Sequence, residues 1–260
     1  MKKIAVCYKW VLSDADIRVN DKTHQLDMEK CKPQISEYDR NGIECGVQIK
    51  AASGAEFVGV SCGSACAASS KDALSRGPDA VYTLDDAVMA EADSTTTSKV
   101  LAGMIKAIGD VDVVICAEGS SDEYARQTGP RLAALLGWPS VSYVSKVTVN
   151  GDSFDLERKM EEGTEMVTVP APVVLSVLPD VGEAPIPSVK QILGAKKKPA
   201  NEMNLAGIGL SADAVKPFMK VESVLAPVTE RKKIHLNADG KTIDAAAAEL
   251  VKELSAAGIL

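Results

Sequence analysis

Apolar runs alternate with helical patterns along most of this chain, and that alternation limits the folds it can adopt. The runs are apolar on both faces, which is typical of parallel strands that helices cover on each side. The predicted strands are residues 3–8, 56–62, 80–85, 111–117 and 172–178. The predicted helices are residues 35–52, 65–77, 94–109 and 122–137. Repeated strand–helix units imply right-handed crossovers, so we expect an α/β fold with a doubly wound, mostly parallel sheet.

Two stretches interrupt this alternation. Asn150-Gly151 lies between segments of alternating apolar and polar residues, which predicts a type I′ turn and an antiparallel β-hairpin. From about residue 180 the strand pattern gives way to prolines and a basic run, and residues 230–260 predict a short strand, an Asp239-Gly240 turn and a terminal helix. This tail is too small for its own core, so we expect it to lie against the main domain or another chain.

The composition argues against several classes of function. A net charge of −7 over 260 residues does not provide the clustered basic surface that nucleic acids require. The chain lacks an apolar run of about 18 residues, the minimum for a transmembrane helix, so we expect no membrane insertion. The apolar run in MKKIAVCYKW, at the start of the sequence, is too short for a signal peptide, and no small-residue cleavage site follows it. We therefore expect a cytoplasmic protein.

The six cysteines do not predict a metal centre. Cys62 and Cys66 are spaced C-x3-C, but no second pair or nearby histidine completes a zinc set. His24 and His235 are the only histidines in the sequence, so no cysteine–histidine pair for nucleophilic catalysis is evident. We therefore expect reduced thiols that are structural or line a pocket.

Small polar residues follow three of the predicted strands. They are Tyr8-Lys9-Trp10, Ser61-Cys62-Gly63-Ser64 and Glu118 to Asp122. Ligands bind at the carboxyl ends of the strands in open α/β sheets, and helix N-termini there offer unpaired N–H groups to phosphate. Asp122 could accept a hydrogen bond from a ribose hydroxyl, while Arg126 and Thr128 could contact phosphates. These features indicate an adenine-nucleotide-binding domain.

A purely structural interpretation of the same residues stays open. Gly119 to Asp122 could form an ordinary N-cap, with Asp122 capping the next helix, and SCGSAC at 61–66 could be only a turn. Neither GxGxxG nor GxxxxGK[ST] occurs, so the sequence supports neither a dinucleotide Rossmann site nor a P-loop.

Several motifs carry a resemblance that runs nearly the length of the chain. They are VCYKWV, RVND, VSCGS, ALSRGPDAVY, AEGSSDEYARQTGP and IPSVKQILGAKKKP. Together they resemble the beta subunits of electron transfer flavoproteins, most closely the FixA-like branch associated with anaerobic or carnitine-type acyl-CoA metabolism. The resemblance implies an adenine nucleotide alpha hydrolase-like, Rossmann-like fold. It also implies a heterodimer that shares FAD with an alpha subunit.

The resemblance further implies that this chain buries a nucleotide of its own, either AMP or a second FAD that NADH reduces. The implied contacts are Cys7, Tyr8, Lys9, Ser36, Tyr38, Asp39, Cys62, Ala117, Glu118, Gly119, Ser120, Ser121, Asp122, Arg126, Gln127 and Thr128. A D-x-x-x-T-S pattern adds Asp93, Thr97 and Ser98 near the second flavin and favours FAD, although the same residues could simply begin a helix. Tyr124 and Arg126 replace small or acidic residues of the family, so we expect the phosphate contacts to differ from the family's in detail.

The segment 183–198 resembles the family's partner-recognition loop. Its apolar anchor falls on Val189, beside Lys190, and would enter a pocket on an acyl-CoA dehydrogenase-type partner. Pro185 and Pro187 restrict the loop and lower the cost of ordering it, although a domain linker would look similar. We thus expect a nucleotide-binding domain at 1–188, and at 189–260 the end of this loop and an arm that wraps the alpha subunit.

The expected activity is electron transfer without a catalytic residue of this chain. Electrons would pass between a dehydrogenase and other redox partners, with NADH and ferredoxin or flavodoxin added if the protein is electron-bifurcating. The alternative is a stand-alone adenine-nucleotide-binding module of the universal-stress type. That alternative leaves the proline-rich segment and the coreless tail unexplained.

Overall fold

The computed structural model describes residues 1–228, 234, 236 and 242–260. The chain divides into two compact units. The first comprises residues 1–18 and 26–224, and the second comprises residues 19–25 and 225–260. Most of the predicted short strand near residue 234 and the whole Asp239-Gly240 turn lie outside the described residues.

A nine-stranded sheet forms the centre of the first unit within the described residues, in the order β11-β10-β9-β12-β8-β1-β6-β7-β13. Its strands are β1 (Lys3–Cys7), β6 (Glu56–Gly63), β7 (Ala80–Asp85), β8 (Val111–Ala117), β9 (Ser140–Asn150), β10 (Ser153–Met160), β11 (Gly163–Pro170), β12 (Val173–Val177) and β13 (Ala200–Met203). The seven strands β9-β12-β8-β1-β6-β7-β13 are parallel to one another. Strand β10 pairs antiparallel with both β9 and β11. The mostly parallel α/β sheet expected from the sequence is confirmed.

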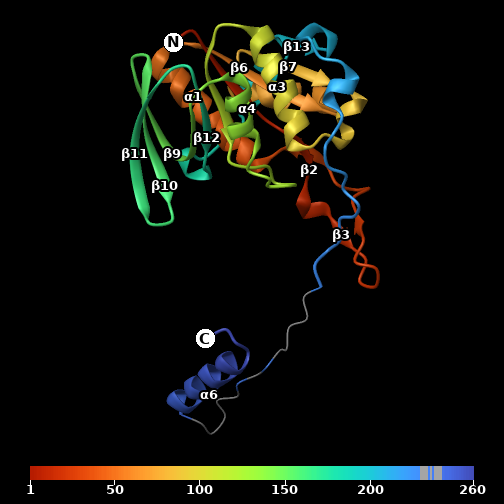
Figure 1. Ribbon diagram of the computed structural model, residues 1–260, viewed down its shortest axis with the longest axis vertical. Helices are drawn as coiled ribbons and strands as arrows, with labels where there is room; N and C mark the ends of the chain where they lie inside the picture. The colour runs from red at the N-terminus through yellow and green to blue at the C-terminus, as the bar shows by residue number, and fades with distance from the viewer. Residues whose placement is uncertain (229–233, 235, 237–241) are drawn as a thin grey trace. The chain divides into compact units, whose positions relative to one another are not determined.

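Helices cover both faces of this sheet, as Figure 1 shows. On one face, α1 (Glu37–Ser53) and α2 (Ser70–Ser75) pack against alternate strand residues, such as Phe57 and Ile115. On the other face, α3 (Ser94–Ile108) and α4 (Thr128–Leu136) pack against the intervening residues, such as Val114. Each strand therefore buries both of its faces, which explains why the apolar runs do not alternate with polar residues. The fold is Rossmann-like and doubly wound, as predicted.

The predicted hairpin is present and is extended by a third strand. Asn150 pairs with Ser153, so the middle of the turn is Gly151-Asp152, one residue later than predicted. Gly151 supplies the left-handed conformation there, with φ of 62°. Strand β11, which the sequence analysis did not predict, returns along β10 to complete a three-stranded antiparallel extension of the sheet.

The predicted helix at 122–137 is shorter than expected. It begins at Thr128, because Tyr124 and Arg126 adopt left-handed φ angles of 46° and 55° that no α-helix contains. The predicted helix at 65–77 is likewise divided into a 3-10 turn at Cys66–Ser69 and the short helix α2.

The chain beyond residue 180 contributes more to the first unit than its composition indicated. After a 3-10 turn at Pro179–Val181 and helix α5 (Val189–Ala195), β13 pairs with β7 and becomes the edge strand of the sheet. Leu205 and Val215 are then buried in the core between the sheet and α3. The tail from 200 to 215 thus lies against the main domain, one of the two arrangements that its small size allowed.

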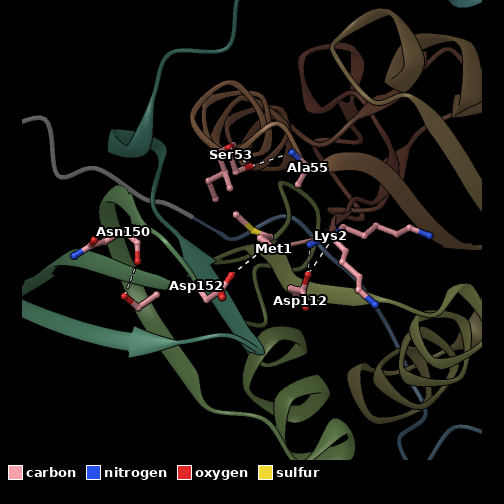
Figure 2. Close-up of polar contacts among 10 residues, drawn as sticks. Met1, Lys2, Ser53, Ala55, Asp112, Asn150 and Asp152 are labelled. Carbon is pink, nitrogen blue, oxygen red and sulfur yellow. Dashed lines mark hydrogen bonds and ion pairs between the residues drawn. The ribbon is translucent and has the colours of Figure 1, made fainter.

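Figure 2 shows polar contacts at the amino-terminal ends of the strands, where oppositely charged groups lie close together. The Met1 ammonium lies 2.8 Å from Asp152 in the hairpin turn. The Lys2 side chain pairs with Asp110 at 2.9 Å, and the Asp112 carboxylate accepts a hydrogen bond from the Lys2 backbone N–H. These contacts connect β1 to β8 and to the antiparallel extension.

The remaining elements are short, apart from one helix. Strand β2 (Trp10–Leu12) pairs with β5 (Pro33–Ile35), and β3 (Arg18–Val19) pairs with β4 (Leu26–Asp27). In the second unit, α6 (Ile243–Ala256) has Thr242 as its N-cap, and the Thr242 hydroxyl accepts a hydrogen bond from the Ala245 N–H. The predicted terminal helix is confirmed. Among the described residues, no helix combines the length and apolarity that a membrane span requires.

Candidate functional site

The candidate site lies where the order of the strands reverses. The chain builds β1, β6 and β7 toward one edge and then returns to place β8 on the other side of β1. The loops that leave β1 and β8 therefore diverge and open a crevice at their carboxyl ends. A pocket of about 290 Å³ occupies this position. Small-molecule sites range from roughly 300 to 1,000 Å³, so this volume suits the AMP part of a nucleotide rather than a whole dinucleotide.

Most of the residues expected to contact a nucleotide line this pocket. They are Cys7, Tyr8, Lys9, Asp39, Cys62, Thr97, Ala117, Glu118, Gly119, Ser120, Asp122, Arg126, Gln127 and Thr128. They come from five segments at strand or helix ends: the end of β1, the start of α1, the end of β6, the start of α3, and the segment that joins β8 to α4. The fold thus brings together residues that the sequence analysis selected from separate strand ends.

The other expected residues, Ser121 among them, lie outside the lining, within or next to the segments that carry it. The Ser36 hydroxyl accepts a hydrogen bond from the Ser121 N–H at 3.2 Å, which joins the start of α1 to the loop after β8. The Tyr38 ring lies 5.1 Å from the ring of Tyr124. The Ser98 hydroxyl donates to the carbonyl oxygen of Ser94 at 2.6 Å, within the first turn of α3.

Asp93, also outside the lining, is the N-cap of α3. Its carboxylate accepts from the Thr96 N–H at 2.8 Å, from the Phe218 N–H at 2.7 Å and from the Met219 N–H at 3.2 Å. Burial alone would raise the pKa of this carboxyl, but these backbone hydrogen bonds hold its pKa below the ordinary value. The helix cap that the sequence allowed for Asp93 is present, and the carboxylate also binds the chain near residue 218.

One lysine and several carboxylates make up the charged wall of the pocket. Lys9 Nζ lies 2.7 Å from Asp122 and 3.5 Å from Glu123. Burial would raise the pKa of the Asp122 carboxyl, but the Lys9 ammonium and nearby hydrogen bonds keep it below its ordinary value. Asp122 is therefore ionised and can accept a hydrogen bond from a ligand hydroxyl.

Asp39 differs from Asp122 because it is buried. Burial raises the pKa of its carboxyl from 3.8 to about 7, against the opposing effect of a hydrogen bond from the Lys9 N–H at 2.8 Å. The negative charge of Asp122 adds to the increase. Asp39 thus exchanges a proton near neutral pH at the wall of the pocket.

The loop from Glu118 to Gln127 has an unusual backbone. Tyr124 and Arg126 are both left-handed, and the Arg126 guanidinium lies 5.3 Å from the centre of the Tyr124 ring. Gly119 permits this arrangement, because a Cβ atom there would lie 2.6 Å from Cδ2 of Tyr124. Left-handed non-glycine residues cost free energy, and they cluster at ligand-binding loops. Arg126 lines the pocket and is a suitable partner for phosphate.

Helix α4 begins at the pocket without a side-chain cap. Gln127 occupies the N-cap position, but its side chain makes no capping hydrogen bond and its Oε1 instead accepts from the Ser94 hydroxyl at 2.9 Å. Asp122 does not cap this helix, so the capping role considered for it is wrong. The first N–H groups of α4 thus have neither an intrahelical acceptor nor a side-chain cap, which makes this helix start suitable for an anion.

Four thiols, those of Cys7, Cys62, Cys66 and Cys116, line the pocket. The pKa of the Cys7 thiol is raised by a hydrogen bond with Cys116 and by burial, and burial raises the pKa of Cys66 to about 12. The thiols of Cys7 and Cys66 are therefore neutral, and the four cysteine side chains present a soft, weakly polar surface that suits an aromatic ring. No metal-binding group of histidine, cysteine or carboxylate side chains occurs among the described residues.

Sequence reasoning missed one wall of the pocket. Met89 and Ala90 line it from the 3-10 helix Ala87–Glu91, which follows β7 and is capped by Asp86. The rule that ligands lie at strand ends would have found this segment if it had been applied to the strand at 80–85 as well. Leu101, on the inner side of α3, had no such signal because it matches an ordinary core position.

The expected docking residues lie on a separate, exposed segment. Pro185 and Pro187 precede α5, and a capping box between Ser188 and Gln191 begins that helix. Val189 is 73% exposed and Lys190 is also exposed. Ile186, Ile192 and Leu193 extend the exposed apolar surface.

Lys198 anchors the chain just after this segment. Its ammonium donates to the carbonyl oxygens of Pro78 at 2.7 Å and Leu74 at 3.0 Å, at the end of α2. This lysine of the basic run therefore has a structural contact within the first unit.

Fold and pocket together define the class of protein: a Rossmann-like α/β domain with a nucleotide-sized pocket at its topological switch point. Residues 24–207 match the electron transfer flavoprotein domain. The chain belongs to the electron transfer flavoprotein family. Nothing in this match favours the universal-stress alternative.

Proposed function

We propose that this chain is the beta subunit of a cytoplasmic, heterodimeric electron transfer flavoprotein of the FixA-like branch. The observation that carries the proposal is the convergence of Cys7 to Lys9, Cys62 and the 117–128 loop on one pocket at the switch point, in a chain of this family. The subunit binds and orients a nucleotide, and it transfers electrons together with an alpha subunit rather than transforming a substrate.

The pocket supplies the groups that an adenosine phosphate requires. Arg126 and the uncapped start of α4 suit the phosphate. The Asp122 carboxylate suits a ribose hydroxyl, and the neutral thiols with Met89 suit the flat face of the base. AMP and FAD share this part, so the lining fits both.

The sequence pattern at Asp93, Thr97 and Ser98 favours FAD in this chain, in addition to the FAD shared with the alpha subunit. A bound flavin would accept a hydride from NADH and pass on single electrons, with ferredoxin or flavodoxin as one acceptor. The protein's own residues hold this group, exclude water from its buried part and set the charge around it, through Lys9, Asp122 and Asp39.

Helix α5 and the residues before it are the proposed docking site for an acyl-CoA dehydrogenase-type partner. Ile186 and Val189 are 93% and 73% exposed, which is unusual for residues that could be buried in the core. The short capped helix and the two prolines hold these side chains outward at little cost of ordering.

The chain from Lys216 onward is the proposed arm that wraps the alpha subunit. Phe218, Met219, Val221 and Val224 are apolar and mostly exposed. In functional terms we keep the division between a nucleotide domain at 1–188 and a partner-binding part at 189–260. The segment 200–215 additionally completes the sheet and core of the first unit.

The test is to co-express the chain with its alpha subunit, purify the complex, denature it and quantify the released FAD and AMP. Two FAD per heterodimer would support the bifurcating form, and one FAD with one AMP would support a simple electron carrier. Release of no nucleotide beyond the alpha subunit's own FAD would overturn the assignment of the pocket. Failure to form a heterodimer would overturn the assignment as a beta subunit.

A further inference from the structure

Asp93 connects two parts of the first unit that are far apart in the sequence. One carboxylate oxygen accepts from the Thr96 N–H in the first turn of α3, and the other accepts from the N–H groups of Phe218 and Met219. Asp93 is 9% exposed, so its carboxylate is largely shielded from water, and the hydrogen bond from Thr96 is buried while those from Phe218 and Met219 are partly buried. The start of α3 and the start of the proposed arm therefore share one buried anion.

Neighbouring residues of α3 reinforce this connection. The Thr96 hydroxyl donates to the carbonyl oxygen of Lys216 at 3.3 Å, and Lys99 Nζ donates to the carbonyl oxygen of Ala214 at 3.4 Å. The same Lys99 ammonium lies 5.3 Å from the centre of the Phe218 ring. The path of the chain from 214 to 219 is thus determined by the first two turns of α3.

The same turns of α3 also form part of the pocket. Ser94 and Thr97 line it, and the Ser94 hydroxyl donates to the Gln127 side chain at 2.9 Å. The Ser98 hydroxyl lies 3.4 Å from the carbonyl oxygen of Thr128, at the start of α4. A ligand that orders the 118–128 loop would therefore also order the turn that holds the arm.

We propose that Asp93 is a positioning residue that couples occupancy of the nucleotide pocket to the position of the arm at residues 216–219. The inference rests on the proposed function, because it requires a nucleotide in the pocket. It assigns Asp93 a role different from contact with a flavin. Both of its carboxylate oxygens already accept backbone hydrogen bonds, and the negative carboxylate would repel the phosphates of a flavin nucleotide. Coupling of this kind is reciprocal: whatever fixes the arm tightens nucleotide binding by the same factor.

The test uses hydrogen exchange at the single amides of Phe218 and Met219 in the full chain, with and without saturating AMP, and then FAD. Binding is measured in the same samples by equilibrium dialysis. In the wild-type protein we expect a bound nucleotide to slow exchange at both amides by at least about fivefold, the lower end of typical coupling between sites. The Asp93→Asn variant keeps a good helix cap, but its amide cannot accept at all three positions. We expect this variant to bind nucleotide more weakly and to show no slowing.

Asp86→Asn is the matched control. Asp86 caps the 3-10 helix Ala87–Glu91 of the pocket wall through the Val88 N–H at 3.0 Å, and we expect this variant to keep the full slowing at 218 and 219. Thr96→Val decides the question if Asp93→Asn does not fold, because it keeps the Asp93 carboxylate and removes the hydroxyl contact to Lys216 and the Thr96 side-chain hydrogen bond to Asp93. Reduced slowing in Thr96→Val supports the coupling, and unchanged slowing overturns it.

The outcomes separate this inference from the proposed function. Nucleotide binding without slower exchange in the wild type overturns the coupling and leaves the nucleotide-binding assignment intact. Slowing that persists in Asp93→Asn also overturns it. If neither AMP nor FAD binds, the proposed function fails and the coupling fails with it.

Discussion

The two ends of the central sheet use charge in different ways. At the amino-terminal end, each of three cations has a carboxylate partner: Met1 with Asp152, Lys2 with Asp110 and Lys3 with Glu56. At the carboxyl end, Lys9 faces the carboxylates of Asp122 and Glu123, Asp39 is buried nearby, and the Arg126 guanidinium lies against the Tyr124 ring. The positive charges at the first end are thus neutralised by carboxylates of the same chain. The second has groups suited to a ligand, which is expected where binding rather than stability determines the residues.

The largest effect should come from Asp39, because its charge is buried at the ligand-binding end. The pKa of its carboxyl is raised in the folded protein, so the folded state binds the proton more tightly than the unfolded state. The stability it contributes is complete below pH 3.8 and is lost as the pH rises through about 7. Between pH 3.8 and about 7, loss of the Asp39 contribution should lower the free energy of unfolding by up to about 4 kcal/mol.

Asp39→Asn should remove this pH dependence, because the amide oxygen can still accept from the Lys9 N–H without a charge. Urea unfolding of both proteins across this window measures the effect. The variant should gain stability relative to the wild type as the pH rises, and a constant difference would contradict the prediction.

Gly129→Val should have the next largest effect, by disturbing the start of α4. A Cβ atom at this position would lie 2.1 Å from the Ser176 hydroxyl oxygen on β12. We expect the free energy of unfolding to fall by about 1 to 3 kcal/mol, the usual cost of overpacking a core. Urea unfolding measures the change. Adding Ser176→Ala should restore part of the loss, because this hydroxyl is buried without a hydrogen-bond partner among the described residues. Equal stability of Gly129→Val and the wild type would show that the contact relaxes freely.

Arg126→Ala should weaken nucleotide binding while leaving stability nearly unchanged. Loss of a charge-assisted hydrogen bond to phosphate typically costs about 1.5 to 3 kcal/mol, so the Kd for AMP should rise at least about tenfold. Isothermal titration calorimetry measures the Kd. Lys146→Ala is the control, because it removes the same charge from a surface ion pair with Glu157 on the antiparallel extension. A similar loss in both variants would indicate a general electrostatic effect and no phosphate contact at Arg126.

The smallest effect should come from the amino-terminal end. Asp152→Asn removes the exposed partner of the Met1 ammonium, and exposed ion pairs contribute little to stability. We expect no measurable change in nucleotide binding and a small decrease in thermal stability that disappears at high salt. A clear loss of nucleotide binding would end the distinction between the two ends of the sheet.

The sequence predicted the buried part of the fold well, because burial imposes a simple pattern. Strands β7 and β8 begin and end where the apolar runs do, since helices cover both of their faces. The switch-point pocket was also predictable, because its lining follows strand ends. The edge strands β11 and β13 were missed, as they are half exposed and their residues carry no apolar run.

The loop before α4 could not be predicted from local pattern. Residues 122–127 contain good helix formers, but Lys9 and the Ser120 hydroxyl engage Asp122, and Tyr124 turns back onto Gly119. These contacts come from residues distant in the sequence or from the turn itself, and they override local propensity. The cap formed by Asp93 was visible in the sequence, whereas its second role at Phe218 required the three-dimensional structure.

The order of the strands also determines when the pocket can form as the protein is synthesised. Strand β1 leaves the ribosome first, yet Lys3 pairs with Glu56 on one side and with Val111 on the other, so its second neighbour arrives much later. Strand β12, the other neighbour of β8, follows only at Val173. Such distant pairing is slow and exposes apolar strand edges until the partners arrive. A nascent chain that ends before residue 128 has no complete pocket, so a nucleotide can stabilise this domain only after about half of the 260 residues have been made.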